Sequence, residues 1–226
     1  MIPRRMSMTG TRQSCPGNVC LISWRIICPP EPRPVMDERV QRALERWPNV
    51  PDVYGWLSLD RRGRWRLDGG IVRNRNTREA IDRNYACDDR GRWYYQNGPQ
   101  RVFASLEYTP WIHNIDGAGE LRTHTGLKVN RLKRVWVDEC WSLLLHTEHG
   151  IGAVADNDAV QLLDRFCDNA GTLLDVDAVE RRLTAYPAMM NHLNLFLSWQ
   201  GLHPVERILS TEVRVRFGFD PAPAAP

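Results

Sequence analysis

The sequence lacks any long apolar run. Even its longest apolar stretches, such as residues 143–145, have only a few residues. A helix that crosses a membrane needs about 20 consecutive, mostly apolar residues. We therefore expect no membrane association and a cytoplasmic location. The length of 226 residues suits one domain or two small ones, and contents of 42% hydrophobic and 25% charged residues are typical of a globular protein.

Lysine is nearly absent as well. Of the 30 basic residues 28 are Arg, and Lys128 and Lys133 are the other two. The formal charge of +3 comes from residues 1–35, whose five Arg and one Glu give +4 and leave −1 for residues 36–226. A neutral body argues against nucleic acid as a partner, because such binding depends on many cations placed near phosphates.

The motifs of common catalytic and cofactor sites are missing too. The chain has no Gly-x-Ser-x-Gly nucleophile elbow and no Gly-Lys-Ser/Thr phosphate loop. The glycine pairs in residues 117–119 and 150–152 lack the third Gly of a dinucleotide-binding fingerprint. We therefore predict no cofactor.

Residues 1–35 differ from the rest of the chain. They hold Cys15, Cys20 and Cys28 and show no sustained periodicity, and they lack the uninterrupted apolar stretch of a signal peptide. We expect a disordered or mis-annotated leader, with translation starting at Met36. The other three cysteines are isolated in the sequence, as reduced thiols would be: Cys87, Cys140 and Cys167.

A short motif occurs twice. Apolar residues at helical spacing predict a first helix over residues 37–46, followed by strands at 53–59, 64–68 and 71–72. The run Leu59-Asp-Arg-Arg-Gly-Arg-Trp65 then returns 28 residues later as Cys87-Asp-Asp-Arg-Gly-Arg-Trp93. A Gly-containing turn follows each run after the same interval. This pattern predicts a duplicated β-turn-β-turn-β unit over 57–72 and 85–103, with Trp65 and Trp93 equivalent and buried.

The rest of the chain mixes strands and helices. Asn76 and Glu79 resemble a capping box for a short helix that ends near residue 84, and a fainter third copy of the hairpin is expected over 193–208. A helix capped by Asn157 or Asp158 and another helix that stops before Pro187 are also predicted. Further strands are expected at 112–115, 121–123, 134–137, 143–147 and 151–155.

These elements define an α+β fold of antiparallel β-sheets built from repeated β-hairpin units with short flanking helices. We expect the first helix and the duplicated hairpins in residues 36–115 and a C-terminal α+β region in residues 116–220. Residues 221–226 have nothing to bury and are expected to be disordered.

The run from Asp88 to Val102, with Leu106-Glu-Tyr-Thr-Pro-Trp111, resembles a proteobacterial family of unknown function. That family also shows a Thr-Glu-x-Gly segment, here residues 147–150, and a C-terminal Arg-Phe-Gly, here residues 216–218. The resemblance covers residues 36–220 and implies a Gly near Cys140-Trp141, where this chain has none. More distantly, the rhythm is similar to a repeated-motif α+β family with a suggested signalling role, and neither resemblance implies a reaction.

One segment offers metal-ligating side chains. His146, Glu148 and His149 lie within four residues. On a strand, His146 and Glu148 would share a face while His149 pointed away or lay in the turn, which is poor geometry for three zinc ligands. We interpret the segment as a solvated hairpin end.

A weak binding surface remains. If Trp93 and Tyr95 face the core, alternation puts Arg92, Tyr94 and Gln96 on the other face, with Arg101 across the turn and Tyr108 and Trp111 soon after. Aromatic side chains beside Arg are typical of binding hot spots, although such aromatics pack in a core more often than not. We therefore favour a non-enzymatic regulatory module that binds a small molecule or a protein; the alternative is a metal-dependent or hydrolytic enzyme.

Overall fold

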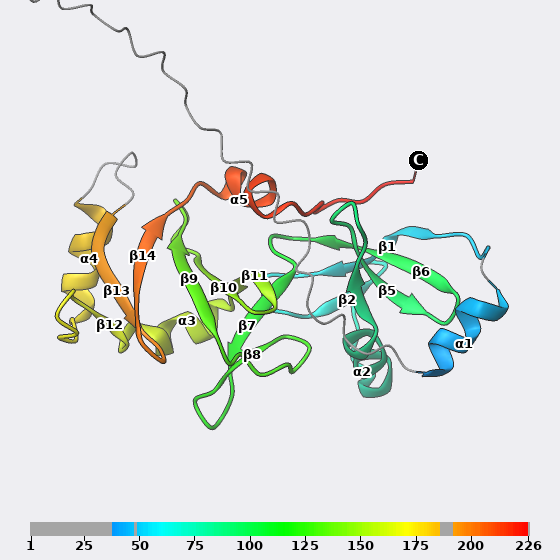
Figure 1. The fold of residues 1–226 in the computed structure, drawn as a ribbon, viewed down its shortest axis with the longest axis horizontal. Coiled ribbons are helices and arrows are strands. Elements are labelled where there is room, and N and C mark those ends of the chain that lie inside the picture. The colour runs from blue at the N-terminus through cyan, green and yellow to red at the C-terminus, as the bar shows by residue number, and fades with distance from the viewer. Residues whose placement is uncertain (1–37, 48, 186–191, 226) are drawn as a thin grey trace, which may run out of the picture.

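The computed structural model describes residues 38–47, 49–185 and 192–225 (Figure 1). The expectations for residues 1–35, including the start at Met36, lie outside this part of the chain. Two β-sheets lie side by side, with helices at their edges and faces (Figure 1). Among the described residues, no helix is long and apolar enough to span a membrane.

The first sheet has six strands in the order β3-β2-β1-β6-β5-β4. Neighbouring strands are antiparallel except β1 and β6, which pair in parallel. Helix α1 (Glu38–Arg46) precedes the sheet, and α2 (Arg75–Arg83) connects β3 to β4. The strands are β1 (Val53–Leu59), β2 (Trp65–Leu67), β3 (Gly70–Ile71), β4 (Tyr85–Cys87), β5 (Trp93–Asn97) and β6 (Gln100–Leu106).

The second sheet has eight strands in the order β12-β13-β14-β9-β10-β11-β7-β8. Its parallel pairs are β14–β9 and β11–β7. The strands are β7 (Trp111–Ile115), β8 (Leu121–Thr123), β9 (Leu132–Val137), β10 (Leu143–Thr147), β11 (Gly150–Val154), β12 (Phe166–Cys167), β13 (His192–Ser198) and β14 (Leu202–Arg207). The helices of this half are α3 (Asp156–Leu163), α4 (Val176–Thr184) and α5 (Ser210–Phe217).

The two sheets share one strand order. Six strands of the second sheet correspond in order to the six strands of the first: β11-β10-β9-β14-β13-β12 match β3-β2-β1-β6-β5-β4. In both sets of six strands the two central strands pair in parallel and the other neighbours are antiparallel. Helices α2 and α3 occupy the same connection in the two halves, and α4 is an insertion between β12 and β13. The β7–β8 hairpin adds to the edge strand β11, whereas no strand of the described residues pairs with the free edge of the corresponding strand β3.

One turn recurs five times. In each turn an Asp side chain accepts hydrogen bonds from the backbone N–H groups two and four residues later, and the Asp carbonyl oxygen accepts one from the residue three later. Such local bonds are why Asp favours turns. The five residues are Asp60, Asp88, Asp116, Asp138 and Asp168.

The third residue after each Asp has a positive φ. Four of the turns place a Gly there, with φ between 74° and 83°. In the fourth turn Trp141 takes the position with φ 64°, so the turn forms even though the expected Gly is missing. A non-Gly residue in this region carries a steric cost, because its Cβ approaches the backbone.

Three clusters of buried side chains hold the sheets together. The largest joins the inner face of the first sheet to the second sheet and to α5, and it includes Trp65 and Trp93, which are 1% and 6% exposed. A second cluster fills the space between the second sheet and α3 and α4. A third, smaller cluster lies on the outer face of the first sheet and consists of Ala86, Tyr94 and Phe103. The first sheet is therefore apolar on both faces.

Several local expectations differ from the structure. The N-cap of α2 is Asn74, whose side chain accepts from the Thr77 N–H, rather than Asn76. Helix α3 begins after Ala155 without a side-chain cap, rather than at Asn157 or Asp158. The expected boundary at 115/116 falls inside the β7–β8 hairpin. Helix α5 and the parallel strand pairs were not expected.

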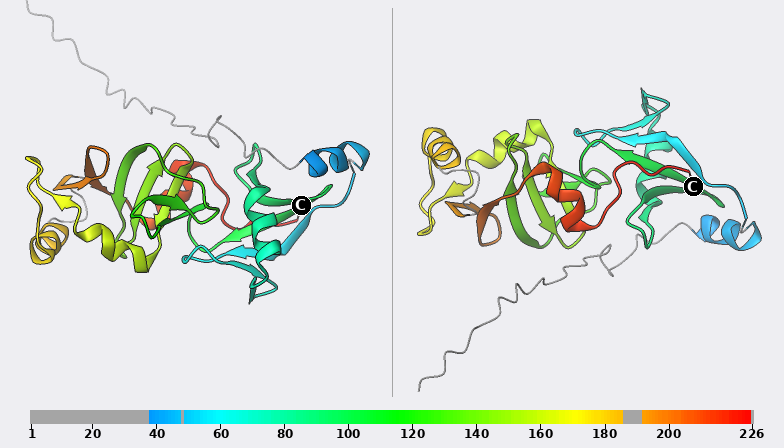
Figure 2. Two further views of the ribbon diagram at one scale, coloured as in Figure 1. Left: turned by 90° about the horizontal axis from the view of Figure 1, so that it is seen from below. Right: turned by 90° about the horizontal axis from the view of Figure 1, so that it is seen from above.

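The C-terminal tail differs as well. Rather than having nothing to bury, the tail packs along the first sheet: the Pro221 carbonyl oxygen accepts a hydrogen bond from the Leu106 N–H at 2.8 Å, and Pro223 is buried. In Figure 2 this segment leaves α5, beside the second sheet, and runs over the first sheet. It therefore spans both halves of the molecule.

Candidate functional site

Two of the six residues predicted to bind a partner pack on the outer face of the first sheet. The Arg92 guanidinium lies 4.5 Å from the centre of the Phe103 ring, and its Nε donates to Asp88 at 2.8 Å. The Arg101 guanidinium lies 5.0 Å from the centre of the Tyr94 ring. Both Arg side chains therefore cover an aromatic cluster.

Three of these residues are buried, and for Tyr94 and Trp111 this agrees with the alternative of core packing stated above. Tyr94 is 6% exposed, Gln96 1% and Trp111 4%. Alternation does place Trp93 and Tyr94 on opposite faces, but each face has its own apolar cluster, and both rings are buried. The Gln96 side chain donates to the Gly98 carbonyl oxygen at 2.9 Å.

The last two predicted residues lie between the halves. The Tyr108 hydroxyl donates to Asp138 at 2.7 Å, and the Arg61 guanidinium stacks 4.4 Å from the centre of the Tyr108 ring. The Trp111 ring packs edge-on against the Trp93 ring in the large core cluster. The six residues therefore do not form one exposed surface.

The side chains of His146, Glu148 and His149 do not come together as ligands for a metal ion. The Glu148 carboxylate accepts the backbone N–H groups of Asn130 and Arg131, and the His149 ring is hydrogen-bonded to the Lys128 carbonyl oxygen. His146 instead packs against Trp136 and Phe217. Within the part of the chain that the structure describes, no three His, Cys, Asp or Glu side chains are grouped to hold a metal ion.

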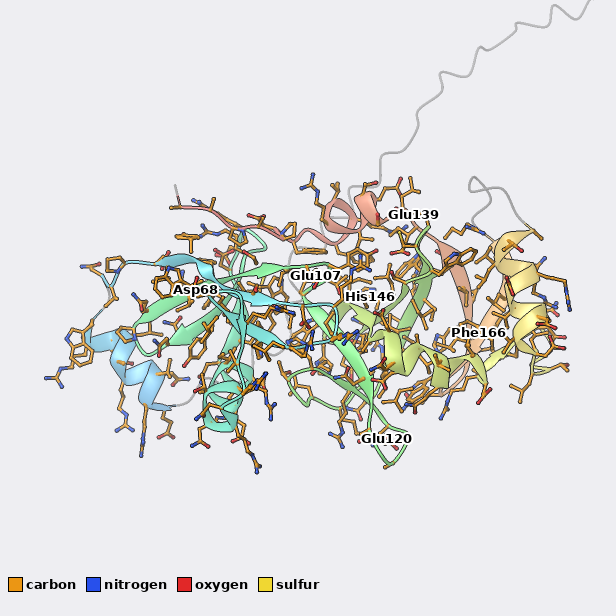
Figure 3. The ribbon with its side chains drawn as sticks, turned by 180° about the vertical axis from the view of Figure 1, so that it is seen from behind. Asp68, Glu107, Glu120, Glu139, His146 and Phe166 are labelled. Carbon is orange, nitrogen blue, oxygen red and sulfur yellow. The ribbon has the colours of Figure 1, made fainter. Side chains whose placement is uncertain are left out.

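A pocket of about 410 Å³ lies where β9 and β10 meet the last turn of α5. Its position follows from the sheet register, which places His146 on β10 directly opposite Arg134 on β9. Figure 3 labels His146 on the second sheet, next to α5. The basic pocket, as we call it, is lined by Arg131, Lys133, Arg134, Trp136, His146, Arg216 and Phe217.

Four of the seven lining residues are cations, and none is a carboxylate. Among the described residues, no ion pair involves any of these four cations. The Arg216 guanidinium lies 5.1 Å from the centre of the Trp136 ring. The nearby Glu148 carboxylate is occupied by two backbone N–H groups.

The titration of two lining side chains reflects this positive charge. Burial, together with the positive charges of Lys133, Arg134 and Arg216, lowers the pKa of His146 to about 4. Burial also lowers the pKa of Lys133, and Arg131 acts in the same direction, while Glu148 opposes both. His146 is therefore neutral at pH 7, whereas the cations around it attract a negative charge.

The chemistry of this pocket suits an anion. Arg side chains present forked donors that match phosphate and carboxylate oxygens, and the volume lies within the range of small-molecule sites. Sequence reasoning missed the pocket because Arg216 comes from a helix that was not predicted. The feature of the sequence that indicates this pocket is the run Arg131-Leu-Lys133-Arg134, which has three cations in four residues.

A second cavity, of about 380 Å³, lies between the second sheet and helices α3 and α4. Its lining is almost wholly apolar, and Glu180 is the only charged residue in it. It therefore lacks the convergent polar groups that would fix a ligand's orientation.

This chain belongs to the DUF2944 family, described as "Protein of unknown function (DUF2946)", whose model matches residues 36–224. Comparison with the curated proteins finds no match. Among solved structures, the chain is similar to a DUF1285 family protein from Silicibacter pomeroyi DSS-3. The two are 15% identical, the match covers 59% of this chain and 87% of that chain, and the TM-score is 0.43.

Proposed function

We propose that this protein is a non-enzymatic regulatory module that binds a small organic anion in the basic pocket. The observation that carries the proposal is the convergence of four cations, without a lining carboxylate or an ion pair, on a pocket of about 410 Å³. Concentrated positive charge without a partner favours a negatively charged ligand.

The size and lining of the pocket narrow the class of ligand. The volume exceeds that of one phosphate group, and the Trp136 and Phe217 rings form part of the wall. We therefore propose a phosphate monoester dianion that carries an apolar group. Its oxygens would accept from the Arg side chains, and its apolar part would lie against the aromatic edges.

The test is a calorimetric titration with phenyl phosphate at constant ionic strength. Inorganic phosphate and benzyl alcohol separate the anionic from the apolar contribution, and phenyl phosphate is expected to bind most tightly. The matched variants are Arg216→Ala and Arg214→Ala, because both Arg residues are exposed near the end of α5 and only Arg216 lines the pocket.

A hydrogen bond to a charged group contributes about 1.5–3 kcal/mol, and 1.4 kcal/mol corresponds to a factor of ten in affinity. Arg216→Ala is therefore expected to weaken binding by about tenfold or more, and Arg214→Ala by much less. Equal losses for the two variants would show only general charge attraction. No saturable binding of phenyl phosphate to the wild-type protein would refute the proposal.

A further inference from the structure

The basic pocket is connected to the other half of the molecule by four residues. Arg216 and Phe217 line the pocket, and the next residue, Gly218, ends α5 in the left-handed conformation with φ 65°. Phe219 then enters the large core cluster. Residues 218–221, which we call the strap, cross from the second sheet to the first (Figure 2).

The strap docks on the second Asp turn of the first sheet. The Asp220 N–H donates to the Gly91 carbonyl oxygen at 2.9 Å, and the Leu106 N–H donates to the Pro221 carbonyl oxygen at 2.8 Å. The contact at Gly91 is close, because a Cβ there would lie 2.1 Å from the Gly218 carbonyl oxygen. The strap therefore fits only against a turn with Gly at this position.

The helix that carries Arg216 depends on the residues after its C-terminal end. Helix α5 has eight residues, and helices this short are marginal on their own. Its anchors to the core are Val213 and Phe217. The last turn, which bears Arg216, is thus held by the core on one side and by the docked strap on the other.

We propose that the strap is a positioning element for the basic pocket: its docking at Gly91 holds Arg216 in the arrangement that binds the anion. This inference rests on the proposed function. Coupling between two sites is reciprocal, so an anion in the pocket also stabilises the docked strap. Arg92, which was predicted as a binding residue, then lies in the turn that receives the strap.

The chain offers a matched pair of variants. Gly91 and Gly119 occupy the same position in two Asp turns, each with φ 77°. A Cβ at Gly119 would meet only the end of the Arg165 side chain, at 4.0 Å, whereas a Cβ at Gly91 would collide with the strap. Gly91→Ala and Gly119→Ala therefore carry the same backbone strain and differ in strap docking.

The test measures phenyl phosphate affinity by calorimetry and stability by thermal unfolding. Gly91→Ala is expected to weaken binding by fivefold or more, and Gly119→Ala to leave the affinity within a factor of two. In an Arg216→Ala background, Gly91→Ala is expected to weaken binding no further, because both changes act through one side chain. A merely structural loss would not vanish in this background.

Hydrogen exchange in the wild-type protein gives a second measurement, which does not depend on a variant that folds. Saturating phenyl phosphate is expected to slow exchange of the Asp220 N–H by fivefold or more. Unchanged exchange, or equal affinities for Gly91→Ala and Gly119→Ala, would overturn the positioning role while leaving the proposed function intact. No binding of phenyl phosphate to the wild-type protein would overturn both.

Discussion

His113, which is fully buried, and His124, which is partly buried with an enclosed Nε2, should make this protein sensitive to mild acid. His113 lies on β7 and His124 directly follows β8. The His124 ring packs edge-on against Trp65 and Tyr85 in the core. Burial and, to a smaller extent, His149 lower the pKa of His113 from 6.5 to about 4. Burial and, to a smaller extent, His113 lower the pKa of His124 to about 3. Both rings are neutral in the folded protein near pH 5.

The sign of the effect is set by proton linkage. Because the unfolded chain binds protons on these rings below about pH 6.5 and the folded protein does not, stability is fully present above pH 6.5. It is lost as the pH falls toward 4. At pH 5 each of these two rings costs about 2 kcal/mol relative to pH 8, so together they should lower the free energy of unfolding by about 4 kcal/mol. His146, whose pKa is also lowered to about 4, acts in the same direction. This is a large part of the 5–15 kcal/mol typical of a native protein.

The assay is urea unfolding followed by circular dichroism at pH 8, 7, 6 and 5. His124→Asn is the informative variant, because the Asn oxygen can replace the ring Nδ1 that accepts from the Ile112 N–H. This variant should lose stability at every pH, but its free energy of unfolding should fall by about 2 kcal/mol less than that of the wild-type protein between pH 8 and pH 5. A free energy of unfolding that is flat between pH 8 and pH 5 would refute the reasoning.

Three further predictions concern stability. Trp65→Ala and Trp93→Ala should each cost about 3–5 kcal/mol in chemical denaturation, because both rings lie in the large core cluster; a loss below 1 kcal/mol in either would contradict the equivalent roles of the two hairpins. Tyr94→Ala should lower the melting temperature by several degrees, because the ring is buried under Arg101; an unchanged melting temperature would mean that the packing of this ring contributes nothing to stability. Trp141→Gly should be about 1 kcal/mol more stable than Trp141→Ala, because φ is 64° at this position; the opposite order would mean that the turn carries no strain there.

Local patterns predicted local structure well. The α+β class, the hairpins around Asp60 and Asp88 and the burial of Trp65 and Trp93 all follow from strand alternation and turn residues. Pairing between distant strands does not follow from such patterns. The parallel contact of β1 with β6 joins residues that are nearly 50 positions apart, as in the pair of Leu59 and Leu106.

The same limit explains the errors at the site. Alternation separates Tyr94 from Trp93 correctly, but it cannot show that a second apolar cluster covers the other face. The basic pocket combines β9 and β10 with Arg216, which is 82 positions after Arg134. Helix α5 was missed because its apolar residues do not mark one face: Val213 is buried, whereas Val215 is 76% exposed.

The most direct test of the central claim is an NMR titration that observes the Arg Nε–H resonances as phenyl phosphate is added. Binding in the basic pocket predicts saturable shifts for Arg134 and Arg216. No shift is expected for Arg64, whose Nε already donates to Asp60 at 2.8 Å. The His146 ring resonances should shift at the same ligand concentrations, because this ring lines the pocket. Shifts that spread over exposed Arg residues without saturating, or a saturable site elsewhere, would contradict the account.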